Sequence, residues 1–148
     1  MLEIRDLHAA YGRSAALHGV NLAVAPGEVV CLIGRNGVGK TSTLRAVVQE
    51  LVHVTGGAVL HEGVSLVGLA PHQVIGRGIG YVPEDRRVFA SLTVAENLRV
   101  PARAPRGAAS RWTIDAVYDL FPQLREYRGR VAGVMSGGEQ QMLSIARS

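Results

Sequence analysis

The stretch Gly34-Arg35-Asn36-Gly37-Val38-Gly39-Lys40-Thr41 decides the fold of this chain. It fits the pattern G-x-x-x-x-G-K-[ST], in which a glycine-rich backbone wraps around a phosphate group. An apolar run over residues 29–33 precedes it and predicts a buried strand, and residues 41–51 predict a helix. Strand, loop and helix in this order form the context that a phosphate-binding loop requires.

The residue types explain how this loop would hold a polyphosphate. Its three glycines allow positive φ, so that the backbone amides turn inward as an anion-binding nest at the start of the helix. Lys40 is the only lysine among 16 basic residues. A compact ammonium suits a narrow loop better than a planar guanidinium, so we expect Lys40 to reach the β- and γ-phosphates and Thr41 to hold Mg²⁺. The expected nucleotide contacts in this loop are Gly34, Asn36, Gly37, Val38, Gly39, Lys40, Thr41 and Ser42.

Composition excludes several classes of protein. The chain has 148 residues, 47% of them hydrophobic, without an apolar run of the roughly 18 residues that a membrane span needs. A single cysteine, Cys31, excludes a disulfide framework and fits a reducing cytoplasm. The net charge is +4, but the arginines are scattered and few aromatic residues lie among them, so no nucleic acid partner is expected.

The rest of the chain shows strands first and helices later, which predicts a mixed-sheet core followed by a helical part. The expected strands are residues 2–7, 20–24 and 79–82, with a hairpin of 58–60 and 64–66 around Glu62-Gly63. The expected helices are 71–77, 93–98 with Thr93 and Glu96 as a capping box, and a segment with Ile114, Val117, Tyr118 and Phe121 on one face. Residues 101–110 predict a loop, and Ser136 opens a last helix that is expected to continue to Ser148.

A second motif, Met135-Ser136-Gly137-Gly138-Glu139-Gln140-Gln141, stands at the start of that last helix. By itself, Ser-x-x-Glu is an ordinary capping box. Together with the phosphate loop, however, it resembles the ATP-binding cassette (ABC) ATPases, in which an LSGGQ-like signature follows the loop at about this distance. The resemblance implies an α/β P-loop NTPase fold with a RecA-like core, an antiparallel β subdomain and a helical subdomain.

The resemblance also implies roles for individual residues. Tyr11 falls where an aromatic ring stacks on adenine, and Glu84 falls in the Q-loop, which senses Mg²⁺ and the γ-phosphate and where most members carry glutamine. Ser136, with the amides of Gly137 and Gly138, would bind the γ-phosphate held by a partner. The implied catalytic residues are Lys40, Glu84 and Ser136, the metal ligands are Thr41 and Glu84, and the cofactors are ATP and Mg²⁺.

Within this family, the string YVPEDRRVFASLTVAENL over residues 81–98 resembles an ATPase subunit of branched-chain amino acid importers. Asp85 departs from the glycine common in that subgroup, and Met135 and Glu139 depart from the common leucine and glutamine of the signature. The implied partners are a second ATPase subunit, placed head to tail, and transmembrane permease subunits. The implied location is the cytoplasmic face of the membrane, and urea or short-chain amides are alternative solutes.

We expect three segments: residues 1–83 as the nucleotide-binding core, 84–134 as the Q-loop and helical subdomain, and 135–148 as the signature. The family continues to an Asp-Glu strand and a switch histidine that this sequence does not contain. The expectation is therefore the first part of a longer protein, with the C-terminal part of the core missing and without hydrolysis by itself. A DNA-maintenance ATPase of the same superfamily and a non-catalytic ATP-binding fragment are the alternatives.

Overall fold

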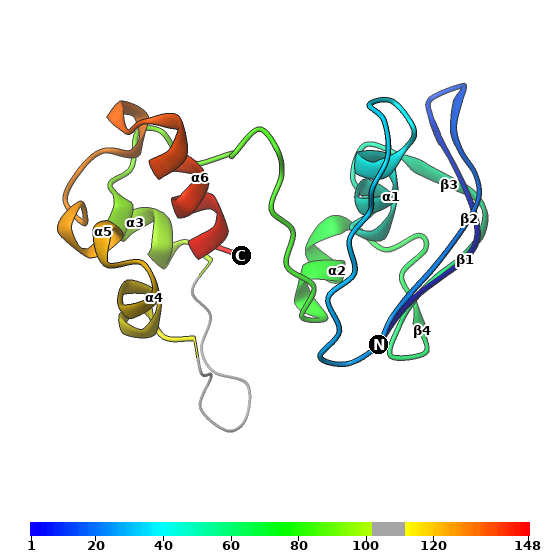
Figure 1. Ribbon diagram of the computed structural model, residues 1–148, viewed down its shortest axis with the longest axis horizontal. Helices are drawn as coiled ribbons and strands as arrows, with labels where there is room; N and C mark the ends of the chain where they lie inside the picture. The colour runs from blue at the N-terminus through cyan, green and yellow to red at the C-terminus, as the bar shows by residue number, and fades with distance from the viewer. Residues whose placement is uncertain (102–111) are drawn as a thin grey trace. The chain divides into compact units, whose positions relative to one another are not determined.

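The computed structural model describes residues 1–101 and 112–148 and divides into two compact units, Met1–Ile79 and Gly80–Ser148 (Figure 1). Each unit has its own hydrophobic core. The loop expected over residues 101–110 lies almost entirely outside the described residues. The phosphate loop belongs to the first unit, and the signature motif and Glu84 belong to the second.

The first unit is built on an antiparallel sheet with the strand order β2-β1-β3-β4. The strands are β1 (Leu2–Tyr11), β2 (Ser14–Val24), β3 (His53–His61) and β4 (Val64–Ser65). Glu62 and Gly63 join β3 to β4 with φ of 52° and 77°. Two left-handed residues in a row give the twist that a two-residue hairpin needs. The hairpin predicted at this position is confirmed.

Two helices complete the first unit, α1 (Lys40–Val47) and α2 (Pro71–Gly76). Helix α1 lies against β2 and β3 (Figure 1). It ends four residues before the predicted Leu51, because Gln49 and Leu51 adopt left-handed backbone with φ of 57° and 62°. The buried core joins sheet and helices through apolar side chains that include Ile4, Leu7, Leu17, Ala46, Val47, Val59, Leu66 and Val74.

Two predicted strands are wrong: in the described chain, residues 29–33 and 79–82 pair with no strand. The predicted burial of the first is also wrong, because Val29 and Ile33 are 95% and 91% exposed. Val30 and Leu32 between them are half-buried, so the side chains alternate as in a strand. An apolar run thus identified an extended segment, but a strand also needs a neighbour to bond, and the run says nothing about that neighbour.

The second unit is helical. Its elements are α3 (Val94–Arg99), α4 (Ile114–Leu120), α5 (Pro122–Glu126), the 3-10 turn η1 (Ala132–Val134) and α6 (Gly137–Ala146). The helices predicted over 93–98 and around Ile114 are confirmed, and the apolar face of α4 packs into a core built around Val94, Leu98, Leu124 and Leu143. Helix α6 stops at Ala146, so the prediction that it continues to Ser148 is wrong.

Capping explains where these helices begin. The Thr93 hydroxyl accepts a hydrogen bond from the Glu96 amide at 3.3 Å, and the Glu96 carboxylate accepts one from the Thr93 amide at 2.8 Å. The predicted capping box is therefore formed. The hydrogen bond from the Thr93 backbone is the main cause that lowers the pKa of the Glu96 carboxyl. Among the described residues, no helix has both the length and the apolar character that crossing a bilayer requires.

Candidate functional site

The phosphate loop ends in a left-handed glycine at the start of α1. Gly37 and Gly39 have φ of 83° and 99°, and Gly39 is the residue that precedes the first turn of the helix. A side chain at residue 39 would also meet the Leu17 methyl at 2.8 Å. Both strain and contact therefore require glycine here. The loop leaves the first amides of α1 with no side-chain cap, which is the arrangement that an anion-binding helix start needs.

Gly34 serves the loop in a different way from the other two glycines. Its backbone does not adopt positive φ, so the expectation of three left-handed glycines is wrong at this position. A β-carbon on Gly34 would stand 3.0 Å from the Val38 methyl. The loop folds back so that Val38 comes close to this position, and Gly34 contributes room rather than left-handed φ.

Lys40 crosses the loop that it terminates. Its ammonium donates hydrogen bonds to the carbonyl oxygens of Gly34 at 2.8 Å and Arg35 at 2.7 Å. The first helical residue is thereby tied to the first residues of the loop. An ammonium in this position lies where an anion held by the loop amides would find a positive charge. The exposed side of the loop, over residues 34–38, leaves that anion a path of entry.

Tyr11, at the end of β1, lies beside the first turns of α1. Its hydroxyl is 3.3 Å from the Ser42 hydroxyl and accepts a hydrogen bond from Arg45 at 3.2 Å. The bond to Ser42, followed by the effects of Arg45, lowers the pKa of the Tyr11 phenol. Its ring packs against the core of the first unit. The structure thus joins two of the predicted site residues, Tyr11 and Ser42, and adds Arg45, for which the sequence offered no local signal.

The signature motif forms the start of α6. The exposed Ser136 caps the helix, its hydroxyl accepting from the Glu139 amide at 3.4 Å, and the Glu139 carboxylate accepts from the Ser136 amide at 2.6 Å. That backbone hydrogen bond is the main cause that lowers the pKa of the Glu139 carboxyl. The Ser136 side chain also hydrogen-bonds the Glu139 carboxylate, which adds to the lowering of that pKa.

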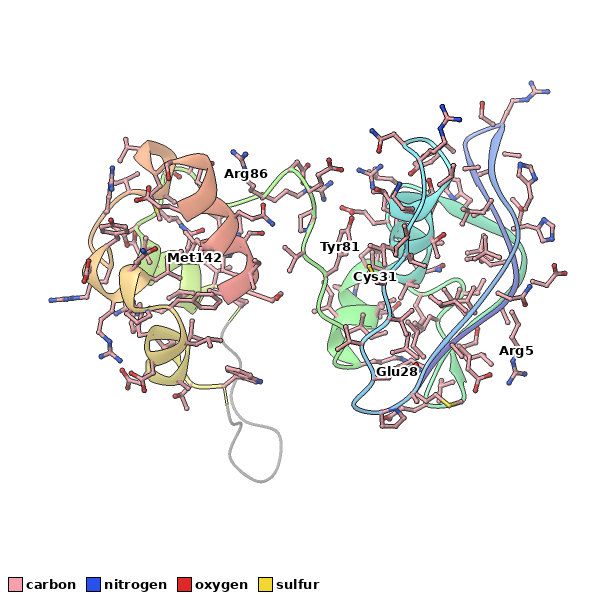
Figure 2. All side chains as sticks on the ribbon, in the orientation of Figure 1. Arg5, Glu28, Cys31, Tyr81, Arg86 and Met142 are labelled. Carbon is pink, nitrogen blue, oxygen red and sulfur yellow. The ribbon has the colours of Figure 1, made fainter. Side chains whose placement is uncertain are left out.

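Glu84 lies exposed in a turn of the same unit as Ser136. The turn continues through Asp85, whose carboxylate pairs with the Arg87 guanidinium at 2.9 Å. Arg86, between them, lies beside α6 (Figure 2) with its guanidinium nitrogens 2.9 Å from the point where Gly137 would carry a β-carbon. The structure therefore brings the segment after Glu84 to the signature helix, an association that sequence reasoning did not anticipate.

A family profile described as ABC transporter matches residues 17–148, a span that holds both the phosphate loop and the signature. This chain belongs to the ABC transporter family. Among curated relatives, the branched-chain amino acid transport protein BraG of Pseudomonas aeruginosa is 43% identical over 148 residues, which are 100% of this chain and 63% of that protein. A probable LivF protein of Archaeoglobus fulgidus is 37% identical over 99% of this chain and 61% of its own length.

The fold of this ABC-family chain agrees with solved structures. A structure of the ATP-binding subunit of an ABC transporter superposes with a TM-score of 0.83 at 29% identity, covering 100% of this chain and 61% of that one. The predicted P-loop NTPase fold with its antiparallel sheet is therefore confirmed. The chain spans about three fifths of the length of these relatives, 63% and 61% for the two transport proteins.

Proposed function

We propose that this chain is the nucleotide-binding part of an ABC importer ATPase that drives uptake of branched-chain amino acids. The observation that carries the proposal is the 43% identity with BraG, which extends over the whole chain. Function is divided among residues 1–83, which bind nucleotide, 84–134, which contact the permease, and 135–148, which hold the signature. The protein acts on the inner membrane face, bound to permease subunits, with a second ATPase subunit placed head to tail.

The residues present fit ATP. An exposed loop with two left-handed glycines and one ammonium, ahead of a helix start that has no side-chain cap, supplies the positive field that a triphosphate needs. Thr41, in the first turn of α1, is a hydroxyl ligand of the kind that Mg²⁺ takes beside phosphate oxygens and water. Glu84 is the second proposed ligand. When bound, Mg²⁺ would neutralise charge on the phosphates during their transfer.

Lys40 and Ser136 have complementary tasks in this proposal. Lys40 exchanges its bonds to Gly34 and Arg35 for bonds to the β- and γ-phosphates. Ser136 exchanges its side-chain hydrogen bond to Glu139 for one donated to the γ-phosphate held by the partner subunit's loop. Two subunits would therefore close around each ATP, so that neither acts alone. Such a partner arrangement gives a task to an exposed serine at the start of a helix.

A chimeric transporter tests the proposal. The aligned part of BraG is replaced by this chain in a Pseudomonas strain that lacks BraG, and uptake of labelled leucine is measured. We expect leucine uptake by the chimera. This uptake should disappear with Lys40→Ala, because ATP binding by the phosphate loop drives it. A chimera that is present at the membrane with its permease but takes up no leucine would contradict the assignment to branched-chain substrates. Retained ATP binding without uptake would favour the non-catalytic alternative.

Replacing Tyr11 by alanine is expected to weaken ATP binding more than tripolyphosphate binding. Stacking of an aromatic ring on a base is worth about 1–3 kcal/mol, and tripolyphosphate has no base. Tyr11→Phe is the matched control, since it keeps the ring and removes the hydroxyl that meets Ser42 and Arg45. Competition with a fluorescent ATP analogue measures both ligands. An equal loss for ATP and tripolyphosphate would mean that Tyr11 only packs.

Replacing Ser136 by alanine is expected to lower ATPase activity of the chimeric transporter by roughly tenfold or more, the effect of losing a hydrogen bond to a charged group. ATP binding to the isolated chain should stay nearly unchanged, because the serine acts on the partner's nucleotide. The control is Thr113→Ala, which removes an equivalent cap from α4, where Thr113 accepts from Ala116 at 3.1 Å. Equal loss of activity in both variants would mean that Ser136 acts only as a helix cap.

A further inference from the structure

The residue directly after the signature helix contacts the segment that follows Glu84. Arg147 stands directly after α6, and its guanidinium donates a hydrogen bond to the Arg87 carbonyl at 2.7 Å. The same guanidinium lies 4.4 Å from the centre of the Phe89 ring, a cation–π distance. The Arg147 side chain therefore contacts both the backbone and an aromatic ring of residues 87–89.

The segment that Arg147 contacts contains two residues with strained backbone. Arg86 and Arg87 have φ of 64° and 45°, and left-handed backbone costs a residue other than glycine roughly 1–2 kcal/mol. The Asp85–Arg87 ion pair at 2.9 Å is exposed, and exposed pairs add little. The hydrogen bond from Arg147 reaches the carbonyl of Arg87, the second of the two left-handed residues, so it acts within the strained pair.

Asn97 fixes the other side of the same segment. Its buried side-chain amide accepts from the Phe89 amide at 2.9 Å and donates to the Phe89 carbonyl at 3.0 Å. It also donates to the carbonyls of Leu92 and Thr93. A fully satisfied buried amide gives a rigid support. Phe89 is thus held by α3 through its backbone and by α6 through its ring.

A second arginine reaches α6 from the segment itself. The Arg86 guanidinium lies on Gly137, in the first turn of the signature helix. Residues 86–89 are thereby linked to both ends of α6, to Gly137 by Arg86 and to Arg147 by Arg87 and Phe89. A segment attached at both ends of a helix cannot shift along it without breaking one of these contacts.

We propose that Arg147 is a positioning residue that makes residues 84–89 and the signature helix move as one body, so that displacement of the Glu84 turn is passed to Ser136. This inference rests on the proposed function, which gives Glu84 and Ser136 their tasks. Burial lowers the pKa of the Arg147 guanidinium, and its Nε is buried with no hydrogen-bond partner among the described residues. The chain therefore accepts a desolvation cost to place a planar cation at this point.

An ordinary role for Arg147 would be that of a positive charge near the end of a helix, where it meets the negative end of the dipole. Lysine would perform that task as well. Lysine lacks the planar fork that here bonds a carbonyl and stacks on a ring at the same time. Arg147→Lys therefore separates the two roles, and Arg147→Met removes both.

Amide hydrogen exchange on the chain is the first measurement. In Arg147→Met and Arg147→Lys, we expect the bonded amides of Arg87 and Phe89 to exchange about tenfold faster, the factor for losing one charge-assisted hydrogen bond. Arg125→Met is the matched control, because Arg125 pairs with Asp119 at 2.8 Å and lies 5.2 Å over Tyr118 without touching residues 84–89. Unchanged exchange in Arg147→Met, or full protection in Arg147→Lys, would overturn the proposal.

The second measurement is the ratio of leucine-stimulated to basal ATPase activity in the chimeric transporter. We expect this ratio to fall about tenfold in Arg147→Met and Arg147→Lys, because the loosened segment no longer passes its displacement to Ser136. The ratio should stay constant in Arg125→Met. Phe89→Leu should lower it as well, which keeps the test decisive if Arg147→Met does not fold. An unchanged ratio alongside activity that Lys40→Ala abolishes would refute the positioning role alone. Activity insensitive to Lys40→Ala and Ser136→Ala would refute the proposed function instead.

Discussion

Lys40→Ala is expected to abolish measurable ATP binding by this chain. The ammonium carries the only lysine charge in the sequence and already bridges the loop by bonds to Gly34 and Arg35. Its loss removes a charge-assisted contact to phosphate, worth about 1.5–3 kcal/mol, and also releases the closed loop. The two effects act together on one ligand, so a loss of tenfold is the lower bound. Titration with a fluorescent ATP analogue measures it.

Two further variants assign the effect to the ammonium itself. Lys40→Arg keeps the charge but introduces a planar fork, which the narrow loop cannot accommodate, so binding should remain severely weakened. Arg35→Ala removes a neighbouring positive side chain while leaving the carbonyl that Lys40 uses. It should change affinity little, since exposed charges act weakly at a distance. ATP affinity that is intact in Lys40→Ala, or equally reduced in Arg35→Ala, would argue against phosphate binding by this loop.

Local signals in the sequence predicted local structure well. The Glu62-Gly63 turn and the Thr93-Glu96 and Ser136-Glu139 boxes each rest on residues that bond to neighbours a few positions away. Such signals are complete within a short window, because every partner is inside it. The phosphate loop belongs to the same class, and its left-handed Gly37 and Gly39 were foreseen for that reason.

Features that depend on distant partners were not predictable. The apolar run at 29–33 indicated an extended segment, but only a neighbouring chain segment could have made it a buried strand. Arg147 meets Arg87 and Phe89 across a long stretch of sequence, and no spacing rule relates them. The buried Asn97 amide supports the Phe89 backbone, and no local pattern in the sequence indicates that contact. These contacts follow from tertiary packing, which sequence motifs do not predict.

Among the glycines that the structure describes, Gly57 is the one whose replacement by alanine is expected to lower the stability most. Gly57, in β3, has φ of 79°, and a β-carbon there would stand 2.1 Å from the Asp6 carbonyl oxygen and 2.4 Å from that of Arg5. Both obstacles are backbone of the adjoining β1, which carries the sheet pairing on each side. A flexible side chain can move away, but a paired strand cannot, so the sheet must part locally to admit the methyl group.

Gly63 isolates this effect from backbone strain. Its φ of 77° nearly equals that of Gly57, but nothing lies within 4 Å of its β-carbon position. Gly63→Ala should therefore cost only the left-handed penalty of roughly 1–2 kcal/mol, whereas Gly57→Ala should cost about 4 kcal/mol or more, the range that marks a specific structural conflict. Urea unfolding of both variants measures the difference. Because β1 also ends in Tyr11 beside α1, Gly57→Ala should weaken ATP binding, while Gly63→Ala should leave it intact. Equal unfolding free energies for the two variants would mean that β1 does not pass as close to Gly57 as the structure places it.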